Sequence, residues 1–325
     1  MRRRDFVAAT LGGGAAQAAG AAQQPPREAQ GGGTGSTSYT VEVTIERPRP
    51  GKPHRGKVLA AIQPHCDDIP LFAGGTVLKL IDEGYTGALI TLSNDSMAGA
   101  GSSIGDIVLK NERDTVEVAK RLGLKDALFL NYPNHNMDAW PLPEIRARLI
   151  FIFRALKVDT VLVYDPSALY ERNPDHYVTA RAVESACMMS GMSWDYPEHS
   201  RVGLKPHAVR EKYYFARGPQ LVNRVVDVGP YMDQKIFANM ANVTQGPSGN
   251  NGARLRQRLA AAGRRLPLLG NDDDTANRQY TRQFALARDR SRGQAHGLEY
   301  AEYFHYIPPD ESEVEGYIEK NSVPL

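Results

Sequence analysis

A histidine and two adjacent carboxylates follow an apolar run near residue 60. Residues 58–62 are typical of a strand buried on both faces of a parallel sheet, and they lead into Pro64-His65-Cys66-Asp67-Asp68. Imidazole and carboxylate are ordinary zinc ligands, and it is unfavourable to bury these groups close together without a cation between them. Neighbouring strand side chains point to opposite faces, so both carboxylates serve one site only if the chain turns at Asp67. This segment alone is equally compatible with a metal-binding turn and with a solvated turn.

A second strand end also carries a histidine. Residues 160–164 are apolar, and after a short loop the sequence Asn173-Pro174-Asp175-His176 opens a helix-like segment that continues to Cys187. Open α/β sheets build their sites where parallel strands end. The repetition therefore favours a metal site that includes His65 and His176 over a solvated turn.

Four segments together resemble the PIG-L/LmbE-like zinc N-deacetylases. They are residues 64–68, the pair Gly74-Gly75, residues 173–176 and the late Ala301-Glu302-Tyr303-Phe304. The motifs of that family are Ala-His-Pro-Asp-Asp-Glu and His-Pro-Asp-His, so each is matched here in part. The order and spacing of the four segments make the resemblance specific, and it covers roughly residues 57–304.

The resemblance implies a role for each matched residue. His65, Asp68 and His176 would be the metal ligands, and Asp67 would be the general base. Three protein ligands leave one coordination position for water, whose pKa a bound Zn²⁺ lowers towards neutrality. A neighbouring carboxylate that is not a ligand can then accept the proton as the water attacks an amide carbonyl. Two histidines and one carboxylate also describe an Fe²⁺ site, so the metal is not fixed by ligand type.

The second motif departs from the family at its first residue. Asn173 replaces a histidine, and an asparagine donates a hydrogen bond but does not shuttle a proton. We therefore expect Asn173 to hold the oxyanion, while Asp67 or His135 delivers the proton. Asp175 either orients a metal ligand or caps the helix. Cys66, in the place of the family proline, is expected to face the core rather than the metal.

Three further residues are candidates for substrate binding. Asn94 and Asp95 follow another predicted strand, and we expect them to bind substrate hydroxyls. The family tends to carry Arg-x-x-Glu where this chain has Asn111 and Asp114, so Arg113 is shifted by two positions and becomes the candidate arginine. His135 lies in a loop on the same rim, where a catalytic role and a purely structural one are equal alternatives.

The pattern of apolar runs predicts an α/β fold. Strands alternate with helices, which indicates a Rossmann-like, mostly parallel sheet with helices on both faces and a smaller C-terminal extension. Gly74 and Gly75 are expected where the first helix packs closely. The predicted strands are 85–92, 127–132, 160–164 and 211–216, besides the first at 57–62; the predicted helices are 70–83, 107–122, 142–156 and 231–242.

The N-terminal residues predict export. The start, Arg2-Arg3-Arg4-Asp5-Phe6, precedes small apolar residues and resembles a twin-arginine signal over residues 1–21, which would send the protein to the periplasm or outside the cell. Residues 22–38 read as a flexible linker, and residues 39–325 as one deacetylase domain that starts with an edge strand at 39–46. Within it, residues 245–280 form a candidate insertion or lid, whose arginines at 254–265 favour a solvated helix over a grip on an acidic glycan.

The net charge of the chain limits the classes of partner that we expect the protein to bind. Loss of residues 1–21 would remove three arginines and one aspartate from 39 basic and 37 acidic residues, which leaves equal numbers of the two. A neutral chain argues against nucleic acid or an anionic membrane as the main partner, and no membrane span is evident. We expect a small-molecule or glycan substrate; the sequence does not define the oligomeric state.

The function expected from these features is hydrolysis of an N-acyl group, most simply N-acetyl, on an amino sugar or glycoconjugate. Two alternatives stay open: the same metal site acting on a non-sugar amide, and an inactive carbohydrate-binding protein on the same fold, which Asn173 and Asn242 favour. A dinucleotide-binding fold is disfavoured because no G-x-G-x-x-G follows the first strand.

Overall fold

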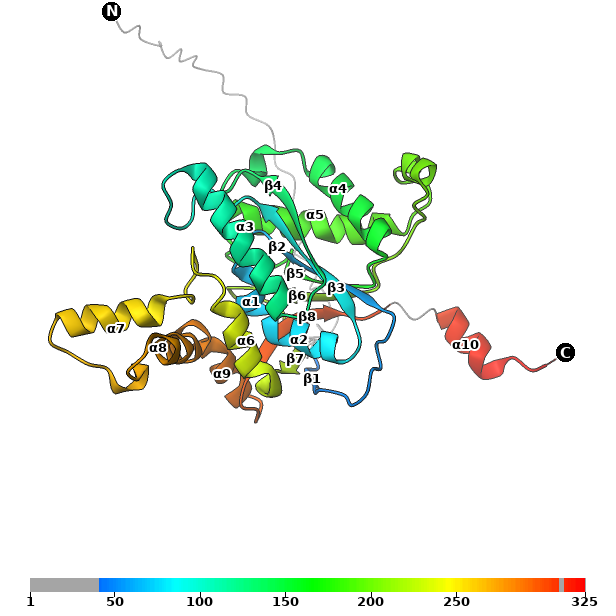
Figure 1. Ribbon diagram of the computed structural model, residues 1–325. Coiled ribbons are helices and arrows are strands. Elements are labelled where there is room, and N and C mark those ends of the chain that lie inside the picture. The colour runs from blue at the N-terminus through cyan, green and yellow to red at the C-terminus, as the bar shows by residue number, and fades with distance from the viewer. Residues whose placement is uncertain (1–40, 310–312, 325) are drawn as a thin grey trace, which may run out of the picture. The chain divides into compact units, whose positions relative to one another are not determined.

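A mixed eight-stranded sheet forms the centre of the protein (Figure 1). The structure is a computed structural model that describes residues 41–309 and 313–324. The strand order is β1-β7-β8-β6-β5-β2-β3-β4. The strands are β1 (Thr44–Glu46), β2 (Val58–Gln63), β3 (Thr86–Ser93), β4 (Asp126–Tyr132), β5 (Thr160–Tyr164), β6 (Glu211–Phe215), β7 (Arg224–Asp227) and β8 (Ala301–Ile307).

Five neighbouring strands are parallel, and β8 is inserted between β6 and β7 in the opposite direction. In the central strand β2, Leu59 and Ala61 pack into one hydrophobic core, whereas Ala60 and Ile62 pack into a second core on the other face. A strand buried on both faces must be apolar throughout, which explains its continuous apolar sequence.

Helices cover both faces of the sheet. The cores contain α2 (Gly74–Asp82), α3 (Ile104–Arg121) and α6 (Met232–Asn239) on one face, and α4 (Leu142–Leu156) and α5 (Pro174–Ser190) on the other. The predicted α/β fold, mostly parallel with helices on both faces, is confirmed. The remaining helices are α1 (Asp68–Phe72), α7 (Asn251–Ala261), α8 (Asp273–Tyr280), α9 (Ala287–Gln294) and α10 (Glu313–Asn321), with α7 and α8 side by side (Figure 1).

The predicted first helix, 70–83, is in fact two helices that meet at Ala73. The break arises because α2 has its own capped start: Glu302 of β8 accepts hydrogen bonds from the backbone N–H groups of Gly75 and Thr76 at 2.8 Å. The close packing expected at the glycines is present, since a Cβ on Gly75 would lie 2.6 Å from Cβ of Val228.

The sequence did not lead us to predict two of the strands. Residues 301–304 were treated only as a motif but belong to β8, and the four-residue β7 was not recognised. The expected edge strand at 39–46 is described from residue 41 onward, and within that part Thr44–Glu46 pairs in parallel with β7. The predicted signal and linker lie outside the described residues. None of the described helices has the length and apolar character needed to span a membrane.

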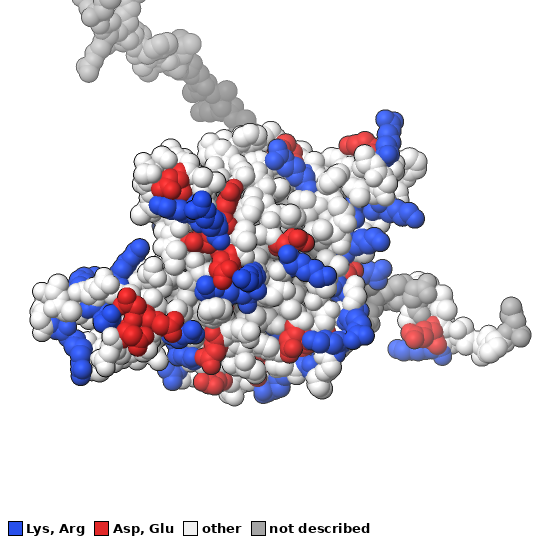
Figure 2. Space-filling model, viewed as in Figure 1, with Lys and Arg blue, Asp and Glu red and all other residues white. Residues whose placement is uncertain are grey.

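Charged side chains of both signs are interspersed over the face shown in Figure 2. Within the core, by contrast, charge is concentrated in a buried cluster. Lys235 of α6 is fully buried and donates hydrogen bonds to Asp289 at 2.5 Å and to Glu302 at 2.6 Å. Because Glu302 also caps α2, this cluster joins α2, α6, α9 and β8.

We expect Lys235→Met to lower the free energy of unfolding by about 3–5 kcal/mol, because two carboxylates would be left buried without a cation. Chemical denaturation followed by circular dichroism measures the change. The matched control is Lys120→Met, which removes a side chain that is 79% exposed and should change stability by less than about 1 kcal/mol. Equal effects of the two substitutions would contradict a structural role for the buried cluster.

Candidate metal centre

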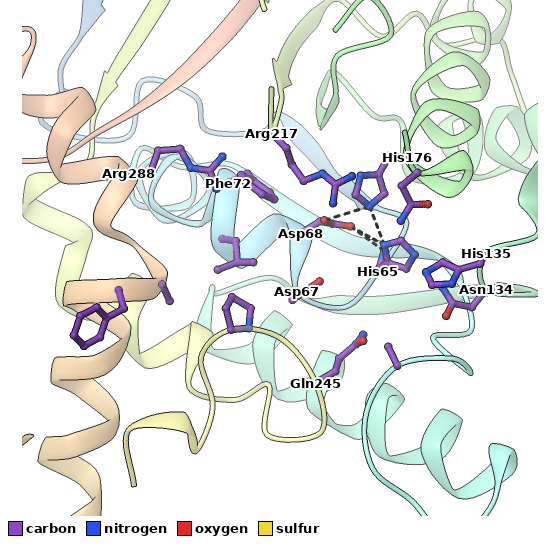
Figure 3. A pocket seen from close by; sticks show the side chains of 16 residues that line it. His65, Asp67, Asp68, Phe72, Asn134, His135, His176, Arg217, Gln245 and Arg288 are labelled. Atoms are coloured by element: carbon purple, nitrogen blue, oxygen red, sulfur yellow. Dashed lines mark hydrogen bonds and ion pairs between the residues drawn. The ribbon is translucent and has the colours of Figure 1, made fainter. Parts of the chain in front are cut away.

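Three buried side chains converge at the carboxyl end of the central strands. His65, Asp68 and His176 each offer one ligand atom, and these atoms all lie within 4.8 Å of one another. Nδ1 of His65 lies 3.0 Å from Nε2 of His176 and 3.4 Å from a carboxylate oxygen of Asp68 (Figure 3). The three residues predicted as metal ligands are therefore brought together.

Neighbouring parallel strands bring these residues to one edge. β2 and β5 are paired in the sheet, so their carboxyl ends meet, as the sequence predicted. His65 follows β2, and Asp68 is the first residue of α1, because the chain turns there with the N–H of Asp68 donating to the carbonyl of His65 at 3.3 Å. His176 lies in the first turn of α5, in the connection that follows β5.

Asp175 fixes the orientation of His65. Its carboxylate contacts Nε2 of His65 at 3.0 Å and accepts hydrogen bonds from the backbone N–H groups of His135 at 2.7 Å and Met137 at 3.2 Å. Because Nε2 carries the proton in this contact, the lone pair of neutral His65 is on Nδ1, towards the other two ligands. Of the two roles considered for Asp175, the geometry fits orientation of a ligand, since Asn173 caps the helix instead.

His176 is oriented in the same way from the other side. Its Nδ1 lies 3.3 Å from Oε2 of Glu171, which leaves Nε2 for the centre of the group. Tyr164 stacks on the ring of His176 with centroids 4.2 Å apart, and its hydroxyl donates to Asp68 at 2.6 Å. Each ligand is thus held by a neighbour that is not itself a ligand.

The donor set fits a divalent cation. Two imidazole lone pairs and a carboxylate that point at one another repel unless positive charge lies between them. Although burial disfavours the charged form of His65, the carboxylates of Asp175 and Asp68 raise its pKa to about 11. For Asp68, burial is outweighed by His176 and His65, and its pKa is lowered to about 2. Positive charge is therefore favoured at this point.

Asp67 lies beside the group without belonging to it. It lines the same cavity as the three ligands, and burial together with the charge of Asp68 raises its pKa to about 6. Gly246, at φ +93°, passes over it so closely that a Cβ would lie 3.2 Å from the Asp67 carboxylate. A carboxylate held next to the ligands but outside their set is the arrangement that proton transfer requires.

The cavity has a volume of about 470 Å³. Asn173 and His135, both predicted as catalytic, line it. The side-chain oxygen of Asn173 accepts a hydrogen bond from the N–H of Asp175 at 3.0 Å, so its amide nitrogen is the group left for a ligand. His135 is held at φ +59° by the contact of its N–H with Asp175.

The three residues predicted to bind substrate do not line this cavity. Asp95 is buried and accepts hydrogen bonds from the N–H of Cys66 at 3.0 Å and from Gln245 at 2.8 Å. Asn94 accepts from the backbone of neighbouring loops. Arg113 is exposed on α3, on the side of the helix opposite its buried residues. These side chains hold loops or face solvent, and the arrangement gives no support to substrate binding by them.

Sequence reasoning missed several residues of the site. Glu171, Tyr164 and Arg217 each lie at or just after the end of β5 or β6, so the same strand-end argument would have identified them. Gln245 also lines the cavity, and so does Arg288, which lies far along the chain where no pattern in the sequence relates it to the proposed ligands. Cys66 is buried and is not among the three ligands, and Gln245 donates to its sulfur at 2.8 Å.

Comparisons with known proteins point to one family. Residues 60–187 match the PIG-L family, described as GlcNAc-PI de-N-acetylase. The chain is 26% identical to a diacetylchitobiose deacetylase of Thermococcus kodakarensis over 198 residues, which are 59% of this chain and 71% of the relative. It is 24% identical to a probable N-acetyl-alpha-D-glucosaminyl L-malate deacetylase 2 of Bacillus cereus over 191 residues, which are 56% of this chain and 80% of the relative.

The fold agrees with these relatives. The N,N'-diacetylchitobiose deacetylase of Pyrococcus horikoshii superimposes with a TM-score of 0.62 at 23% identity, over 78% of this chain and 84% of that one. The matched segment, residues 60–187, includes all three predicted ligands and Asp67. Residues 60–187 therefore match the PIG-L family, as the partial motifs around His65 and His176 had indicated.

Proposed function

We propose that the protein is a metal-dependent hydrolase that removes an N-acyl group, most simply N-acetyl, from an amino sugar or glycoconjugate. The observation that carries this proposal is the convergence of His65, Asp68 and His176 with Asp67 beside them in one cavity. The relatives named above are deacetylases of N-acetylated sugars, which supports the same reaction class here.

The ligand set suits Zn²⁺ and also admits Fe²⁺. When bound, such an ion would lower the pKa of a water molecule and polarise the acyl carbonyl. The protein contributes a fixed site: Asp175 and Glu171 orient the two imidazoles, and Tyr164 holds the carboxylate of Asp68.

Asp67 is the proposed general base. Its carboxylate accepts a proton from the attacking water as the new C–O bond forms, and it returns that proton to the nitrogen as the C–N bond breaks. The products are a carboxylic acid and a free amine. The amide nitrogen of Asn173 is the proposed donor to the oxygen that becomes negative, and His135 is a second group that can donate to the substrate from the cavity wall.

One part of this proposal, export from the cytoplasm, rests on the sequence alone. Export through a twin-arginine signal remains a prediction, because residues 1–21 lie outside the described part of the chain.

A non-sugar N-acyl compound is the alternative substrate, because the group of His65, Asp68 and His176 fits either kind of amide. A panel of N-acetylated sugars and N-acetylated amino acids separates the two by acetate release.

We expect His176→Ala to abolish tight metal binding, because one of three ligands is lost from a buried site. Metal content after dialysis, measured by inductively coupled plasma mass spectrometry, should fall from about one ion per chain to a small fraction of that. His207→Ala is the matched control, since His207 is paired with Asp159 and does not line the cavity. Full metal content in the His176 variant would contradict the proposed ligand set.

We expect Asp67→Asn to keep the metal and to lower kcat by about 10²–10⁴-fold, because an amide cannot accept the proton of the attacking water. Acetate release from the best substrate of the panel measures the loss, and metal analysis verifies that the site is still loaded. Asp138→Asn serves as the control because it removes an exposed carboxyl from a nearby loop. A variant at Asp67 with normal turnover would exclude it as the base.

A further inference from the structure

Arg288 presents a guanidinium group to the cavity of the metal centre. It lies in α9 and is half-buried, and its guanidinium carbon is 4.4 Å from the centroid of the Phe72 ring (Figure 3). Within residues 41–309 and 313–324, no carboxylate forms an ion pair with Arg288, and its side chain donates no hydrogen bond. A cation partly withdrawn from water without a counter-ion is costly unless something else supplies the negative charge.

The other arginine of the cavity is in a different position. Arg217 donates to both carboxylate oxygens of Glu171, at 2.5 and 3.1 Å, so its charge is matched within the protein. Arg217 therefore supports the ligand His176 through Glu171. Burial lowers the pKa of Arg288, and repulsion by Arg217 adds to this, although the charge of Asp289 acts in the opposite direction. The free positive charge of the cavity wall is thus located at Arg288.

The position of Phe72 relates the guanidinium of Arg288 to the proposed metal ligands. Asp68 and Phe72 are four residues apart in α1, so they lie on the same face with their Cβ atoms about 5–6 Å apart. Phe72 is itself fixed by stacking on Phe215, with ring centroids 5.6 Å apart and planes at 13°. Arg288 therefore lies over an aromatic ring that begins one helical turn from the ligand Asp68.

The backbone around Arg288 is rigid. Its neighbour Asp289 is buried against Lys235, which also binds Glu302. A π-helical turn, Thr281–Ala285, precedes α9 and brings Phe284 and Ala285 into the lining of the same cavity. Turns of this kind are frequent at functional sites. These contacts fix the backbone that carries Arg288, which reduces the entropy that this segment loses on binding.

We propose that Arg288 binds an anionic group, a carboxylate or a phosphate, on the same molecule whose N-acyl group lies at the metal centre. This rests on the proposed function and makes it more specific: the substrate is an acidic N-acyl amine whose anion lies about one sugar ring from the acyl nitrogen. The planar guanidinium suits both anions, because each accepts two parallel N–H hydrogen bonds. The Phe72 ring beneath it offers an apolar surface to the carbon skeleton between the two ends.

The test compares three substrates that share one N-acetylated hexosamine. N-acetylglucosamine is neutral, N-acetylmuramic acid adds a carboxylate, and N-acetylglucosamine 6-phosphate adds a phosphate, so the last two distinguish the kinds of anion. Acetate release by the zinc-loaded protein gives kcat and KM for each. We expect at least one acidic substrate to have the higher kcat/KM, and Arg288→Gln to lower the acidic-to-neutral ratio of kcat/KM about 10- to 100-fold, mainly through KM.

Two further variants make the result specific. Arg290→Gln removes an equal charge from an exposed position of the same helix and should leave the acidic-to-neutral ratio unchanged. Arg288→Lys keeps the charge without the planar fork and should restore only part of the ratio. Equal losses with all three substrates in Arg288→Gln, or the same shift in Arg290→Gln, would overturn the proposal and leave Arg288 a packing partner of Phe72.

A binding measurement separates this inference from the proposed reaction. Calorimetry with zinc-loaded Asp67→Asn protein gives the affinity for the same three compounds without turnover. Tighter binding of an acidic compound that depends on Arg288 supports the anion site even where no acetate is released, in which case the deacetylase proposal fails alone. Equal or weaker binding of both acids than of N-acetylglucosamine overturns the anion site, whatever the outcome of the deacetylase assay.

Discussion

The site depends on the 3.0 Å approach of two imidazole nitrogens, Nδ1 of His65 and Nε2 of His176, next to the carboxylate of Asp68. Lone pairs at this distance repel, and two acidic neighbours, Asp175 and Glu171, direct both of them inward. So many buried polar contacts around a repulsive arrangement call for positive charge between the two imidazoles, which a bound metal ion would supply. The chemistry of the cavity follows from that requirement, because a metal with three protein ligands keeps a position open.

The parallel sheet creates this approach. β2 and β5 are far apart in the sequence but paired in the sheet, so the residues that follow them meet at one edge. His65 comes just after β2, and His176 lies in the first turn of α5, which follows β5 through a loop at 165–173. The turn after β2 is also where α1 starts, which separates the two adjacent carboxylates: Asp68 faces the imidazoles, while Asp67 stays beside them under Gly246. Local turn geometry thus places the two carboxylates of one dipeptide differently, as the proposed roles in metal binding and proton transfer require.

This logic explains which parts were predictable from sequence. The parallel strands and the three ligands could be found because each depends on one local pattern, an apolar run followed by polar residues. The break at Ala73 could not, since its cause is Glu302 of β8, a residue 226 positions after Thr76. The substrate-binding assignment of Arg113 relied on family register alone, and α3 turns that side chain to solvent. Arg288 reaches the cavity only through tertiary packing, which no local pattern contains.

The lining of the cavity comes from two parts of the chain. The proposed ligands and the proposed base come from within residues 60–187, whereas the unpaired charge of Arg288 comes from α9. The buried cluster of Lys235, Asp289 and Glu302 ties these parts together, because Asp289 adjoins Arg288 and Glu302 caps the helix that follows α1. Because Arg288 lies in α9 and Asp68 in α1, a substitution at Arg288 can alter the proposed anion binding without removing a proposed ligand or the proposed base. If both proposals hold, the reaction is a property of the sheet edge and the choice of substrate is a property of the helices packed over it.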